Sequence, residues 1–206
     1  RAAAESMLMS GRVLEGEALL RDLCRDVGLR LPGGPRAAAS SLIRSQLKLR
    51  FRGFDFVERS PSSLPLETHL RLETVRAGVL GFSGNQPLLA ASMADRYLEL
   101  ALDSGHVGHI SSGISHQAYF LTLVGTGDRA RTRAEKLLEL AEATAIRSAD
   151  PEIRSVAAFA RGAAALHAGR WSECRAHQAR ALEILRAECR TGRRAWLVEC
   201  AQLHDH

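Results

Sequence analysis

Residues 156–186 read VAAFARGAAALHAGRWSECRAHQARALEILR, and this stretch decides the fold. Gly162 is followed seven residues later by Gly169, and Cys174 is followed seven residues later by Ala181. Because seven residues make about two turns of an α-helix, small residues at this spacing share one helix face and let two backbones approach closely. We therefore predict two packed helices joined by a turn at Gly169.

The same stretch resembles a tetratricopeptide repeat, a family of 34-residue helical hairpins. The resemblance implies that Gly162 lets the second helix pack close, that Trp171 plugs the hairpin and that Cys174 and Ala181 lie where the helices cross. Two positions depart from the family pattern. Ala165 stands where a large aromatic residue is usual, and Arg186 stands near where a proline often ends the unit.

Apolar residues recur at three- and four-residue spacing through most of the chain, which predicts further helices. We expect about nine helices in all, over residues 13–27, 36–51, 66–82, 87–103, 116–124, 129–146, from 151 to the turn at Gly169, over 171–188 and from about 193 onward. Pro35, Pro87 and Pro151 suit the first turn of a helix, and Asp150 suits the cap before one. Residues 47–56 alternate apolar and basic in part, so a strand is the alternative to a helix end that runs into an extended loop.

These patterns predict an all-α protein of antiparallel helical hairpins, stacked as a tetratricopeptide-like α-solenoid. We expect one domain over residues 1–206, with a sub-boundary in the loop at 53–65. Because the chain starts at Arg1 and ends on a charged run, we expect a fragment of a larger protein.

The composition is that of a globular protein, with 46% hydrophobic and 25% charged residues. The net charge is +5, but only Lys48 and Lys136 are lysines among the 28 basic residues, which favours a coding bias towards arginine over selection for phosphate contacts. The sequence contains neither a run of 18 apolar residues nor a signal peptide, so we expect a cytoplasmic protein without a membrane segment. The four cysteines form no CxxC pair, and we expect reduced, mostly buried thiols.

Three histidines in GHVGHISSGISH, at His106, His109 and His116, are the strongest candidates for metal chemistry. No acidic residue lies between Asp103 and Asp128, and no HExxH is present, so we expect hydrogen-bonded or exposed histidines and no metal. No catalytic constellation or cofactor motif is found, and we expect a chain that is not an enzyme and needs no cofactor.

The segments GLRLP at 28–32, LRFRGFDFVERS at 49–60 and GRWSEC at 169–174 suggest a wider resemblance. Their arrangement looks like the helical region that follows the ATPase module in bacterial multidomain Ser/Thr kinases or related signal-transduction ATPases. This resemblance implies a role in sensing or in holding partners. The kinase and nucleotide-binding motifs of such proteins are not in this sequence.

We therefore expect a protein-protein interaction or regulatory scaffold region of a bacterial signalling protein. Its partner is a protein, a peptide or another domain of the parent chain, and His116, Arg154 and Arg161 are the candidate groove residues. An effector-sensing domain that binds a small ligand between helices is the alternative. Nucleic-acid binding through a basic helix face, formed by Arg44, Lys48 and Arg52, is the third reading.

Overall fold

The computed structural model describes residues 1–60, 63–125, 127–148 and 150–188. In these residues the secondary structure consists of helices, with no β-strand, which confirms the all-α prediction. The helices are, in chain order, α1 (Ala2–Met9), α2 (Val13–Asp26), α3 (Pro35–Arg52), α4 (Leu66–Phe82), α5 (Pro87–Ser104), α6 (Val107–Val124), α7 (Asp128–Ser148), α8 (Pro151–His167) and α9 (Trp171–Glu188). The ninth helix predicted from about residue 193 lies outside the described residues.

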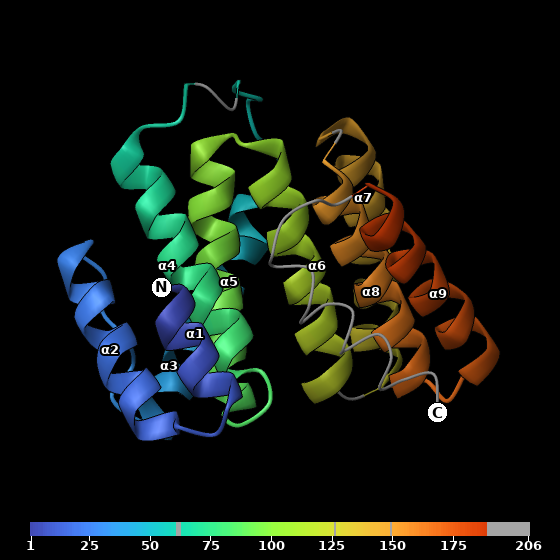
Figure 1. Ribbon diagram of the computed structural model, residues 1–206. Helices are drawn as coiled ribbons and strands as arrows, with labels where there is room; N and C mark the ends of the chain where they lie inside the picture. Colours follow the sequence, from blue (N-terminus) through green and yellow to red (C-terminus); the bar gives the residue numbers. More distant parts are fainter. Residues whose placement is uncertain (61–62, 126, 149, 189–206) are drawn as a thin grey trace. The chain divides into compact units, whose positions relative to one another are not determined.

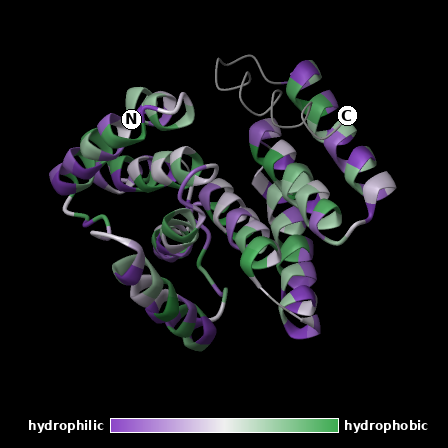
Figure 2. Cartoon of the chain, turned by 90° about the horizontal axis from the view of Figure 1, so that it is seen from below, coloured by the Kyte–Doolittle hydropathy of each residue, from purple (hydrophilic) through white to green (hydrophobic). Residues whose placement is uncertain are grey.

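The helices group into two compact units, Arg1–His109 and Ile110–His206. The division falls inside α6, whereas the expected sub-boundary at residues 53–65 lies within the first unit. In both units most helices carry hydrophilic and hydrophobic residues along their length (Figure 2), as expected where one face packs and the other meets solvent.

The sequence prediction missed α1, which is short and lies beside α2 and α4 (Figure 1). Leu8 of α1 is 1% exposed and sits between two glycines of the neighbouring helices. A Cβ atom would lie 2.7 Å from the Leu8 side chain at Gly16 and 2.5 Å from it at Gly81. The two glycines therefore make the slot that holds α1 in place.

The boundaries of several helices agree with the sequence. Helices α4 and α9 span the predicted residues, and α3 continues to Arg52, so the run at 47–56 is a helix end followed by a loop. The side chain of Asp150 accepts a hydrogen bond from the backbone N–H of Glu152 at 2.9 Å and caps α8. Helix α6 differs, because it begins at Val107 and carries Gly108 and Gly113 inside it, where both are buried.

In the first unit, α3 packs along α5, two helices further on in the chain. Polar contacts join Gln46 to Asp95, Lys48 to Glu99, and Arg52 to Asp103. The partners advance together along both helices, so α3 and α5 run parallel. This arrangement differs from the expected succession of antiparallel neighbours. The long loop after α3 makes the parallel arrangement possible. This loop passes the end of α5, where the backbone N–H of Arg59 donates to the carbonyl of Gly105 at 3.0 Å.

In the second unit, α8 packs against both α7 and α9. Gly162 of α8 faces Gln178 of α9, and a Cβ atom at position 162 would lie 2.7 Å from the Gln178 Nε2. Cys174 and Ala181 are buried at 2% and 1% exposure, and Gly169 turns the chain with a φ of +72°. These four residues lie where hairpin packing requires them.

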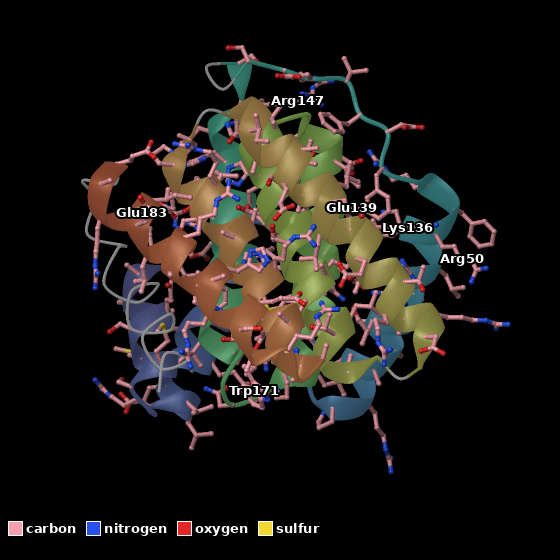
Figure 3. All side chains as sticks on the ribbon, turned by 90° about the vertical axis from the view of Figure 1, so that its right-hand side faces the viewer. Arg50, Lys136, Glu139, Arg147, Trp171 and Glu183 are labelled. Atoms are coloured by element: carbon pink, nitrogen blue, oxygen red, sulfur yellow. The ribbon has the colours of Figure 1, made fainter. Side chains whose placement is uncertain are left out.

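Trp171 is the exception, because its side chain is 67% exposed at the start of α9 (Figure 3). The prediction that Trp171 fills the space between the two helices of the hairpin is therefore wrong. The small residues Ala164 and Ala165, which are 5% and 1% exposed, lie in the buried face of α8. Close packing of alanines leaves no space that an indole ring has to fill.

We predict that Gly162→Ala lowers the free energy of unfolding by about 1–3 kcal/mol, since the new methyl group overpacks against Gln178. The amide of Gln178 is buried and forms no hydrogen bond among the described residues, so truncating it removes the clash without breaking a bond. In urea unfolding, Gly162→Ala combined with Gln178→Ala should therefore cost less than Gly162→Ala alone.

The matched control is Gly169→Ala, which destabilises by about 1 kcal/mol through its positive φ. Gln178→Ala should not rescue this variant. Equal rescue of both glycine variants would contradict the close approach of α8 and α9 at Gly162.

Candidate functional site

The predicted basic face of α3 is largely paired inside the chain. Lys48 Nζ donates to Glu99 at 2.9 Å, and Arg52 donates to Asp103 at 3.0 Å, both on α5. Arg44 forms no ion pair with the described residues. Two of the three cations expected for nucleic-acid contact therefore have carboxylate partners in the protein itself.

We call the contacts of Gln46, Lys48 and Arg52 with α5 the α3–α5 ladder. Asp95 is 1% exposed and accepts from the Gln46 amide at 2.6 Å. Glu99 is 3% exposed and accepts from Lys48 and also from Arg96 of its own helix, at 3.0 Å. Buried carboxylates without such donors are costly. The ladder is therefore the polar contact that fixes α3 on α5.

The opposite face of α3 carries three large apolar side chains without cover. Ile43, Leu47 and Phe51 are 62%, 51% and 87% exposed. They follow one another at a spacing of four, so they form one stripe along the helix. We call these three residues the α3 stripe. Single exposed apolar residues are ordinary, but three in register on one helix face are typical of a binding surface.

Basic side chains border the α3 stripe. Arg36, Arg44 and Arg50 are exposed residues of the same helix, and none of them forms an ion pair in the described part of the chain. Figure 3 shows Arg50 projecting from the molecule. The outer face of α3 is therefore an apolar stripe with positively charged edges. Phe54 and Phe56 of the following loop are partly buried, whereas Phe51 faces solvent.

The expected groove residues of the second unit have partners inside that unit. Arg161 donates to Glu142 at 2.7 Å and to Glu135 at 3.2 Å, both on α7. Arg154 forms an ion pair with Glu188 of α9. Both guanidinium groups therefore tie helices together. Charge reversal at Arg161 should therefore lower the melting temperature, because it breaks both contacts with α7. His116 lies on α6 and is partly buried.

Histidines gather at the start of α6, within the first unit. The ring of His109 stands 4.8 Å from that of His106 and 6.1 Å from that of His69, measured between centroids. Its Nδ1 is 2.7 Å from the Tyr97 hydroxyl, and its backbone N–H donates to His106 Nδ1 at 3.3 Å. The sequence predicts hydrogen-bonded or exposed histidines at positions 106, 109 and 116, and His106 and His109 are hydrogen-bonded. Among the described residues, no three His, Cys, Asp or Glu side chains are arranged to hold a metal ion.

Burial, reinforced by neighbouring His106, lowers the pKa of His109 to about 3. The ring is therefore neutral at physiological pH. Burial also raises the pKa of the Cys24 thiol to about 11 and raises that of Cys174, so both thiols stay protonated. Cys189 and Cys200 lie outside the described residues.

No described helix has the length and apolar character needed to cross a membrane. Comparison with known proteins gave no match to any family model, curated protein or solved structure.

We predict that the rungs of the α3–α5 ladder stabilise the protein in proportion to their burial. Asp95→Ala should lower the free energy of unfolding by about 1–3 kcal/mol, because it leaves the partly buried amide of Gln46 without its acceptor. Asp103→Ala should cost less than about 1 kcal/mol, since the Asp103 side chain is 62% exposed. Urea denaturation of both variants measures the difference. Equal losses would contradict the claim that the buried contact of Gln46 with Asp95 stabilises the protein more than the exposed contact of Arg52 with Asp103.

A second prediction concerns pH. The pKa of His109 is lower in the folded chain than the value of about 6.5 expected for an unfolded one, so below about pH 6.5 the unfolded state binds the additional proton. Stability should therefore fall as pH is lowered, by at most about 1.4 kcal/mol per pH unit from this residue. Urea unfolding between about pH 7 and pH 4 should show a smaller decline for His109→Gln than for the parent chain.

The control is His69→Gln, at an exposed position in ring contact with His109. Because His69 contributes least among the causes of the lowered pKa of His109, this variant should keep most of the decline of the parent chain. A decline that is unchanged in His109→Gln would contradict a neutral, partly buried His109.

Proposed function

We propose that this chain is a non-catalytic helical module that binds a protein partner through the α3 stripe. The observation that carries the proposal is the run of Ile43, Leu47 and Phe51, all more than half exposed and one turn apart. In helix-in-groove and helix-on-helix complexes, one partner contributes an exposed apolar stripe of this kind to the interface.

The chemistry of the edges supports one kind of partner, an acidic amphipathic helix. Arg36, Arg44 and Arg50 offer charge-assisted hydrogen bonds to carboxylates that flank an apolar face. A second copy of the same surface is a poor partner, because it would set arginines against arginines. From Ile43 to Phe51 the stripe is about 12 Å long, which matches two turns of a bound helix.

We further propose that α8 and α9 form a tetratricopeptide-like hairpin in a stack with α7. The approach of Gly162 to Gln178 and the buried Cys174 and Ala181 support this arrangement. Together with the resemblance of the sequence to helical regions of signalling proteins, it supports a regulatory scaffold region of a larger bacterial, cytoplasmic protein.

Affinity capture from bacterial lysate, with and without nuclease, tests the proposed docking surface. The wild-type chain, Leu47→Ser combined with Phe51→Ser, and the control Leu14→Ser would be used as baits. Leu14 is 85% exposed and lies on α2, not on the helix that carries the stripe. We expect a discrete protein that survives nuclease, is retained by Leu14→Ser and is lost from the double variant.

A synthetic probe tests the charge of the partner. A fluorescent 16-residue peptide with leucines at a spacing of four, flanked by glutamates, should bind the wild-type chain about tenfold or more tightly than the double variant. Its twin with lysines in place of glutamates should bind weakly. Equal binding of both peptides, or capture that disappears with nuclease, would contradict an acidic protein partner.

A further inference from the structure

A cavity of about 460 Å³ opens in the first unit between the end of α2, the segment after it, and helices α3, α4 and α5. Its volume lies in the range of pockets that hold small molecules. The buried side chains of Cys24, Val75 and Met93 form an apolar part of its wall. The raised pKa of Cys24 keeps that thiol uncharged.

The polar part of the wall is positively charged. Arg30, Arg44 and Arg96 line the cavity from three different segments, and the lining residues include no aspartate or glutamate. Arg96 is paired with Glu99 at 3.0 Å. Arg30 and Arg44 form no ion pair with any described residue, and Arg44 Nε donates to the carbonyl of Ser40 at 3.3 Å.

Two serine hydroxyls add to this wall. Ser41 and Ser45 lie one turn apart on α3 and both line the cavity. Ser92, also in the wall, donates to the carbonyl of Leu89 at 2.9 Å, as helical serines commonly do. Ser45 is 8% exposed and Ser41 is partly buried, and neither forms a side-chain hydrogen bond with the described residues. Both hydroxyls are therefore available to donate to a ligand in the cavity.

We propose that this cavity binds a small organic anion that carries a phosphate or carboxylate group on an apolar body. The guanidinium groups of Arg30 and Arg44 take the anionic group, since their planar forks match both oxyanions. Ser41 and Ser45 donate to its remaining oxygens, and the apolar wall contacts its body. The site is separate from the α3 stripe, whose apolar residues do not line the cavity.

Titration calorimetry of the full chain at low ionic strength tests the proposal, with phenyl phosphate, benzoate, inorganic phosphate and benzyl alcohol as probes. We expect saturable binding of phenyl phosphate or benzoate, weaker binding of inorganic phosphate and no binding of neutral benzyl alcohol. Whichever of the first two binds more tightly identifies the anionic group. A saturating rise in melting temperature should accompany binding.

Variants locate the site. Arg30→Gln and Arg44→Gln should each weaken binding of the better probe at least about tenfold, since each removes a charge-assisted contact. Arg50→Gln removes the same charge from an exposed position on α3 outside the cavity and should leave the affinity unchanged. Melting temperatures without probe verify that these exposed substitutions leave the fold intact.

Two results would overturn the proposal: no saturable binding of any anionic probe, or an equal loss in Arg50→Gln, which would indicate general charge attraction. Leu47→Ser with Phe51→Ser should bind the anion normally. Arg44 belongs to both surfaces, so the variants that separate them are Arg30→Gln for the cavity and Leu47→Ser with Phe51→Ser for the α3 stripe.

Discussion

The burial of two carboxylates on α5 is the constraint on which the rest of the first unit depends. Asp95 and Glu99 are almost inaccessible to water, and such groups require donors at hydrogen-bond distance. Gln46 and Lys48 of α3 supply them at 2.6 Å and 2.9 Å. This requirement holds α3 parallel to α5 and fixes its rotation about its own axis. An apolar interface alone would allow α3 to slide or turn, because hydrophobic contact is not directional.

Because the rotation of α3 is fixed, the environment of each of its other faces is fixed as well. With Ser45 and Leu49 turned inward, Ile43, Leu47 and Phe51 are left facing solvent, and arginines border them. Between the two faces, Ser41 and Arg44 line the cavity shared with α2 and α5. One helix therefore contributes to a structural contact, an apolar surface and a charged cavity. The two functional surfaces that we propose are consequences of the same structural contact.

Much of the fold could be predicted from the sequence, since proline and aspartate at helix starts and apolar spacing are local signals. The hairpin around Gly162 was predicted for the same reason. The packing of α3 was not, because it depends on residues about 50 positions apart. A signal was nevertheless present: Asp95, Glu99 and Asp103 repeat at a spacing of four, as do Arg44, Lys48 and Arg52. Reading the two series together would have indicated a contact between two helices instead of a basic surface. The exposure of Trp171 and the slot for Leu8 depend on tertiary packing, which the local pattern does not contain.

The central claim is that α3 has one face docked on α5 and one face open to solvent, and thiol labelling tests it most directly. Leu47→Cys and Leu49→Cys place a thiol two residues apart, at positions that are 51% and 1% exposed in the parent chain. After brief treatment with an alkylating reagent, peptide mass spectrometry separates these sites from the native cysteines. The account predicts rapid modification at position 47 and protection of at least about tenfold at position 49, since reaction there requires local opening. Equal rates at the two positions would show that α3 is not held on α5 in the way described, and would remove the basis for both proposed surfaces.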